Sequence, residues 1–88
     1  MQRLVDLIVR LPSSGTIFAR RPWGPDSDAV ISEEGQEPAG YDYLLECDLA
    51  EEVISVWAEW RGGRSPTPTE ATEAVIHYAK TDAYMPTE

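Results

Sequence analysis

The sequence is poor in the side chains that build many catalytic and metal sites, with one cysteine, Cys47, and one histidine, His77. A single cysteine excludes an intramolecular disulfide, and a single histidine excludes a metal site built from several histidines. No apolar run reaches the roughly 18 residues that suggest a membrane-spanning helix, and the N-terminal residues lack the apolar core and cleavage site of a signal peptide. We therefore expect a cytoplasmic protein that uses no metal and no cofactor.

Basic residues are also scarce, since 7 Lys and Arg stand against 16 Asp and Glu, which gives a formal net charge of −9. This charge opposes direct binding to nucleic acid or to an anionic membrane and favours a cationic partner. Residues 22–60 contain no basic residue, and their 11 acidic residues are Asp26, Asp28, Glu33, Glu34, Glu37, Asp42, Glu46, Asp48, Glu51, Glu52 and Glu59. Because an unpaired buried carboxylate is costly, we expect these side chains to form a connected negative patch on the surface. The alternative is an acidic surface that only keeps the protein in solution.

The chain of 88 residues has the length of one small domain, and we expect residues 1–88 to fold as a single unit. A composition with 42% apolar and 26% charged residues is typical of folded globular domains. This length excludes multidomain enzymes, and it leaves few core positions for a buried active site.

The first half of the chain predicts one helix followed by three short strands. A helix is predicted over residues 2–11, because the apolar residues recur there at helical spacing, at Leu4, Leu7, Ile8 and Leu11. Runs of β-prone residues follow at 16–19, 29–31 and 41–47, and the first two are expected to pair as antiparallel strands. In the third run, alternation places one face at Tyr41, Tyr43, Leu45 and Cys47, and a wetter face at Asp42, Leu44 and Glu46.

The second half of the chain predicts two helices that begin with capping boxes. Asp48 is expected to be the N-cap of the first of these helices, with Glu51 three residues later as the acid of its capping box. This helix is expected to end near Trp60. Its expected core stripe consists of Leu49, Val53, Val56, Trp57 and Trp60. An Arg-Gly-Gly-Arg sequence at 61–64 is expected to end this helix. The last helix is expected to begin with Thr67 as N-cap, Pro68 as first helical residue and Glu70 as capping-box acid. The predicted fold class is α+β, a small antiparallel sheet of about three strands packed by three helices in the order α-β-β-β-α-α.

No pattern of residues predicts catalysis. His77 shares a predicted helix face with Glu73 and Lys80, so we interpret it as a surface residue, and Cys47 as a small buried apolar residue. A small hydrolase would need a nucleophile pair such as Cys47 with His77, and no sequence feature brings the two together. The Asp-Ser-Asp run at 26–28 lacks the glycine and the distal glutamate of a calcium-binding loop. We therefore predict that the protein is not an enzyme.

The Leu11-Pro12 turn, the loop around Trp23, the strand from Tyr41 to Leu45 and the ending from His77 to Tyr84 resemble a family of short bacterial proteins of unknown function. This resemblance spans most of the chain, and it implies a compact α+β domain without assigned catalytic residues. In size, charge and lack of catalytic groups, the chain is also similar in kind to inhibitors from phages and mobile elements, such as anti-CRISPR proteins, and to immunity proteins that neutralise nuclease toxins.

These observations favour a non-catalytic acidic protein that binds the basic surface of a nucleic-acid-handling partner and inhibits it, as an anti-CRISPR protein does, with DNA mimicry as one route. The expected partner is a basic protein, such as a CRISPR effector subunit or a nuclease toxin. Two alternatives remain open, an immunity protein for a bacterial toxin and a homodimeric regulatory adaptor, so the protein is expected to be a monomer or a homodimer.

The residues expected to contact the partner are Trp23, Asp26, Asp28, Glu33, Glu34, Glu37, Asp42, Glu46, Glu52 and Glu59. Trp23 lies in a Pro-Trp-Gly-Pro loop among charged residues, which is the composition of a binding hot spot. The other interpretation is that Trp23 folds back as a lid over a small core, and the sequence does not decide between the two.

Overall fold

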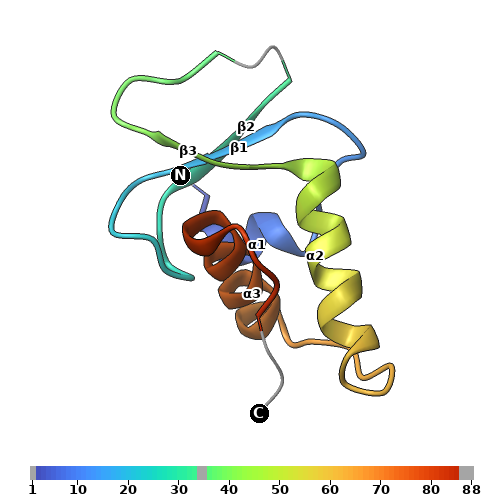
Figure 1. Ribbon diagram of the computed structural model, residues 1–88. Coiled ribbons are helices and arrows are strands. Elements are labelled where there is room, and N and C mark those ends of the chain that lie inside the picture. The colour runs from blue at the N-terminus through green and yellow to red at the C-terminus, as the bar shows by residue number, and fades with distance from the viewer. Residues whose placement is uncertain (1, 34–35, 86–88) are drawn as a thin grey trace.

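The computed structural model describes residues 2–33 and 36–85, and within them it confirms the predicted α+β fold and the order of its elements (Figure 1). The elements are α1 (Leu4–Ile8), β1 (Thr16–Ala19), β2 (Ala29–Ser32), β3 (Asp42–Glu46), α2 (Cys47–Glu59) and α3 (Pro68–Thr81). In Figure 1 the sheet crosses one end of the molecule and the three helices lie together on one side of it. No helix among the described residues is both long and apolar enough to cross a membrane.

The sheet is antiparallel, with strand order β2-β1-β3. β1 lies at the centre, which agrees with its composition, because Thr16, Ile17 and Phe18 are β-branched or aromatic residues that suit a pleated surface. All four of its residues are buried. The expected pairing of β1 with β2 is confirmed, with Ile17 opposite Ile31.

A β-bulge interrupts the pairing of β1 with β3. Ile17 pairs with Leu45 and Phe18 pairs with Tyr43, so that Leu44 is an extra residue between the two pairs. A bulge of this kind breaks the regular alternation of side chains along the strand. Leu44 is therefore only 1% exposed and Tyr43 is 48% exposed. The expected faces of this strand, with Tyr43 inside and Leu44 on the wetter side, are wrong for these two residues.

The first helix is shorter than the predicted 2–11, and the residues before Leu4 make other backbone contacts. Arg3 forms an isolated β-bridge with Asp28, and the N–H of Ala29 donates to the carbonyl of Gln2. The N–H of Leu4, which has no acceptor within the helix, donates to the carbonyl of Ser27. The start of the chain is thus tied to the segment that leads into β2, and helix formation begins only at Leu4.

β3 continues into α2 without a loop, and this corrects the predicted start of the helix. α2 begins at Cys47, its N-cap is Glu46, and no side chain caps it. Instead, the N–H of Cys47 donates to the carbonyl of Gly15, just before β1. Asp48 lies inside the first turn, where its carboxylate accepts from the N–H of Leu49. The expected capping box at Asp48 and Glu51 is therefore wrong.

A single cluster of buried apolar side chains joins the three helices to the inner face of the sheet. α2 contributes Cys47, Ala50, Val53 and Trp57 to the buried set. Trp60, predicted in the core stripe, is 50% exposed, because it lies at the C-cap, beyond the last turn that faces α3. The stripe prediction is thus confirmed for Val53 and Trp57 and wrong for Trp60.

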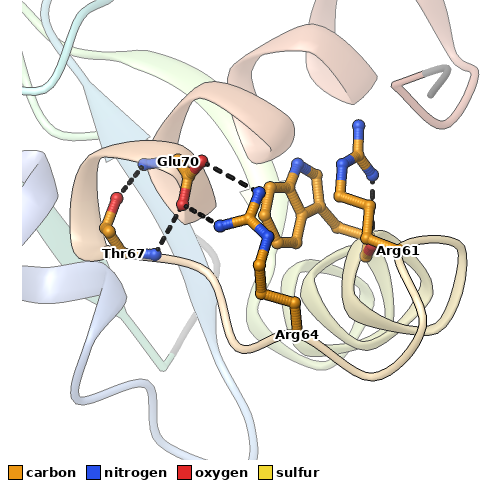
Figure 2. Close-up of polar contacts among 5 residues, drawn as sticks. Arg61, Arg64, Thr67 and Glu70 are labelled. Carbon is orange, nitrogen blue, oxygen red and sulfur yellow. Dashed lines mark hydrogen bonds and ion pairs between the residues drawn. The ribbon is translucent and has the colours of Figure 1, made fainter. Parts of the chain in front are cut away.

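The start of α3 has the predicted capping box (Figure 2). The Thr67 hydroxyl accepts from the N–H of Glu70, and the Glu70 carboxylate accepts from the N–H of Thr67. Arg64 donates both of its terminal nitrogens to the same carboxylate, at 3.2 Å each. This bond from Arg64, together with that from the Thr67 N–H, lowers the pKa of the Glu70 carboxyl below its ordinary value.

We expect Thr67→Ala to lower the free energy of unfolding by about 1 kcal/mol, because the N3 backbone N–H loses its acceptor. Thr69→Ala, an exposed change within the same turn, is the matched control.

The lowered pKa of Glu70 stabilises the fold above the ordinary carboxyl pKa, and this contribution is lost as the pH falls through the lowered value. Urea titrations of wild type and Glu70→Gln should therefore converge between about pH 6 and about pH 3. A constant difference over that range would contradict the assignment.

Candidate partner-binding surface

The acidic residues predicted to contact a partner are divided among separate regions of the molecule. Those nearest the N-terminal arginines form ion pairs. Arg3 Nη1 lies 3.1 Å from Asp26 Oδ1, and Arg21 Nε lies 3.5 Å from Asp42 Oδ2. Arg3 and Arg21 thus pair with carboxylates of the acidic segment, which weakens the negative potential at this end.

Asp28 is the most enclosed of these acids and has a structural role. Its Oδ2 accepts a 2.7 Å hydrogen bond from the Tyr41 hydroxyl and lies 3.4 Å from Arg20 Nε. Arg20 in turn stacks on the Tyr41 ring at 4.3 Å and donates to the carbonyl of Gly40. A Cβ at Gly40 would lie 2.7 Å from the Arg20 guanidinium, and its φ of +82° also favours glycine. These contacts tie β1, β2 and the start of β3 together.

The loop between β2 and β3 contains a second set of acids. Glu33 and Glu37 are exposed there, and Glu34 lies outside the described residues. Glu46, at the end of β3, is half-buried and accepts from the Thr16 hydroxyl at 3.1 Å. The Glu46 carboxylate is therefore held against the neighbouring strand.

The third set lies on the outer side of α2, and we call it the α2 acidic face. It consists of Asp48, Glu51, Glu52, Ser55 and Glu59, all of them exposed. These positions are three or four apart and so share one side of the helix. None of the ion pairs found within residues 2–33 and 36–85 includes these carboxylates. Within the part of the chain that the structure describes, the α2 acidic face therefore keeps its negative charge without a counter-ion.

Aromatic side chains border one side of the α2 acidic face. Trp60 is half-exposed and meets the Tyr84 ring edge-on, with 5.8 Å between centroids. Tyr84 also packs against Tyr78, and its hydroxyl donates to Glu52 Oε2 at 3.1 Å. Partial burial and then the Glu52 carboxylate raise the pKa of the Tyr84 hydroxyl. Sequence reasoning missed Trp60 as a surface residue because its spacing matches the buried residues of α2.

An open hollow of about 390 Å³ borders the other side of the α2 acidic face. Its walls are Ile8, Val9, Arg10, Leu11, Glu51, Ile54 and Ser55. Val9, one of these residues, is 54% exposed. The α2 acidic face therefore lies between an aromatic border and this partly apolar hollow.

Trp23 lies apart from α2, and the structure supports elements of both interpretations of it. The ring packs against the core cluster, and its indole N–H donates to the carbonyl of Ala19 at 3.1 Å. Arg21 covers the ring at 4.0 Å. The same side chain lines a hollow of about 280 Å³ with α3 residues that include His77 and Lys80. Its role in partner binding stays a prediction.

The two candidate catalytic side chains lie in different surroundings. Cys47 is fully buried in the first turn of α2, and burial raises the pKa of its thiol to about 11, with smaller effects from Glu46, Asp48 and Glu51. His77 lines the hollow beside Trp23. A thiol with such a pKa remains protonated near neutral pH and is a poor nucleophile. In the described part of the chain, no three His, Cys, Asp or Glu side chains are grouped to hold a metal ion.

Comparisons of the chain with protein-family models, with curated proteins and with solved structures found no match.

Proposed function

We propose that this protein is a non-catalytic binding protein whose α2 acidic face docks on a basic surface of a nucleic-acid-handling protein and inhibits it by occluding that surface. The observation that carries the proposal is a helix face with four exposed carboxylates that have no ion-pair partner among the described residues. Such a face steers a basic partner to rapid encounter and fixes the orientation of the complex.

The other acids favour this role less. Asp26, Asp28 and Asp42 already have arginine neighbours, and a partner would have to compete with these contacts. The α2 carboxylates, in contrast, are anchored on a regular element of 13 residues. From Asp48 to Glu59 the row spans about 16 Å along the helix axis. This length is comparable to the rise of about five nucleotides along one DNA strand, which supports competition with DNA for a basic groove.

The chemistry of the remaining side chains supports a non-catalytic role. Cys47 is buried with a raised thiol pKa, and His77 faces a different part of the surface. The anti-CRISPR-like and toxin-immunity forms of the proposal share this surface and differ only in the partner. Identifying that partner separates them.

The first experiment captures partners from host lysate on the tagged protein at low salt, elutes them in salt steps and identifies them by mass spectrometry. We expect a basic nucleic-acid-binding protein, released as salt screens the charges. Recovery of only this chain, or of nothing above an untagged control, contradicts the proposal.

The second experiment measures association rates with the captured partner. We expect Glu51→Lys/Glu52→Lys/Glu59→Lys to lower the association rate constant by about tenfold to a hundredfold, because steering is reversed. Glu33→Lys/Glu37→Lys/Glu73→Lys has the same change in net charge elsewhere on the surface and should lower it much less. Equal effects of the two triple variants would contradict a role for α2. Simultaneous binding of DNA and this protein to the partner would contradict occlusion.

A further inference from the structure

The arginines of this chain repeatedly stack on its own aromatic rings. Arg21 lies 4.0 Å from the centroid of the Trp23 ring. Arg61 and Arg64 lie 4.2 Å and 4.6 Å from that of Trp57. With Arg20 on Tyr41, four of the six arginines lie over a ring. Indole faces in this protein are thus used as surfaces for guanidinium groups.

Arg64, Arg21 and Arg20 also contact a carboxylate. Arg64 pairs with Glu70 while it covers Trp57, as Figure 2 shows for the ion pair. Arg21 pairs with Asp42 in the same way, and Arg20 pairs with Asp28. The recurring unit is a guanidinium group with a ring on its face and a carboxylate at its edge. Both contacts match the planar, forked shape of arginine.

Trp60 has the ring and the carboxylates of this unit, and within residues 2–33 and 36–85 no arginine or lysine lies over it. It is half-exposed at the end of the α2 acidic face. Glu52 lies two turns before Trp60 on the same side of the helix, and Tyr84 links the two by its hydroxyl bond and its ring contact. Glu59 is the residue before Trp60 in the chain.

We propose that Trp60 binds an arginine side chain of the protein partner, with the guanidinium stacked on the indole and paired with Glu52 or Glu59. This inference rests on the proposed function and specifies which side chain of the basic partner the surface recognises. A half-exposed tryptophan beside unpaired carboxylates is the composition of an interface hot spot for a cation.

Charge selects this occupant over the other ligands that stack on tryptophan. A nucleic-acid base would bring its phosphates against the α2 carboxylates, and an anionic membrane would be repelled in the same way. Lysine satisfies the charge, but its ammonium is compact and strongly hydrated, and it lacks the flat surface that stacks on an indole. Arginine therefore fits both the ring and the carboxylates.

The test uses two capped peptides of equal charge, hexa-arginine and hexa-lysine, titrated into the full chain at low salt. We expect wild type to bind hexa-arginine at least about threefold more tightly than hexa-lysine. Trp60→Leu should remove this preference and leave the affinity for hexa-lysine nearly unchanged. Tyr43→Leu is the matched control, because Tyr43 is a similarly exposed aromatic residue on the sheet, and it should keep the preference.

A second measurement needs no folded variant. In the proton–nitrogen NMR spectrum of wild type, hexa-arginine should shift the indole N–H signal of Trp60 more than those of Trp23 and Trp57. An unchanged preference in Trp60→Leu, or equal shifts of the three indole signals, overturns the arginine site and leaves the proposed function standing. The proposed function has its own variant here, Glu51→Gln/Glu52→Gln/Glu59→Gln, which should weaken the binding of both peptides. Unchanged affinity of both peptides for that variant overturns the use of α2.

Discussion

Leu44→Ala should lower the free energy of unfolding by about 2–5 kcal/mol, whereas Tyr43→Ala should cost much less. Leu44 is buried at the bulge of β3, and its truncation leaves a cavity between the sheet and the helices. Tyr43 is half-exposed, and its ring is nearly perpendicular to that of Phe18 with 6.3 Å between the centroids, a pair that contributes about 1 kcal/mol.

Urea unfolding followed by circular dichroism measures both changes. Trp60→Leu serves as a reference for the loss of a half-exposed side chain. If Tyr43→Ala were the more destabilising change, β3 would have to pair without the bulge, because regular alternation would place Tyr43 inside. The comparison therefore tests the register of the sheet directly.

Cys47 should react with iodoacetamide at pH 8 about a hundredfold more slowly than an ordinary cysteine. Burial raises the pKa of its thiol from 9.0 to about 11, and the reactive thiolate becomes correspondingly rarer. The rate should rise with pH up to the region of that raised pKa. Steric burial of the sulfur slows the reaction further.

The control is the same alkylation in denaturant, where the rate should return to that of an unstructured cysteine. Mass spectrometry of timed samples gives both rates. Rapid alkylation of the folded protein would show an accessible thiolate, and it would favour a hydrolase that uses Cys47. The pKa of Cys47 is shifted in the opposite direction to that of a catalytic cysteine, whose pKa is lowered by a neighbouring cation.

Sequence reasoning succeeded where neighbouring residues determine the structure. The capping box at Thr67 and Glu70 needs only residues within one turn, and both of its hydrogen bonds are present. The glycines at 62 and 63 adopt the positive φ expected after a helix end, at +71° and +86°. Strand β1 has the predicted bounds, because its β-prone residues are followed directly by a loop rich in proline and glycine.

The incorrect predictions concern residues whose hydrogen-bonding or strand-pairing residue lies far away in the sequence. The N–H of Cys47 finds its acceptor at Gly15, which no local pattern around Asp48 can reveal. The bulge at Leu44 depends on the register against Ile17 and Phe18. In both cases a tertiary contact replaces the local one that the pattern predicted.

The candidate surface was predicted in part. The abundance of acidic residues in the middle of the chain was evident, but their division into paired and unpaired groups depends on where Arg3, Arg20 and Arg21 fold. Trp60 matches the helical period of the core, and only the tertiary structure shows that α2 turns Ala50 and Trp57 inward and leaves Trp60 at the edge.

The packing of α1 against α3 determines when this core can close during synthesis. With only 5 residues, α1 is too short to be stable alone, so Leu4 and Leu7 need cover from outside the helix. Part of that cover comes from α3, which begins at Pro68. On the ribosome, the first apolar side chains therefore remain incompletely covered until the last helix emerges, and final packing of the core follows translation of α3.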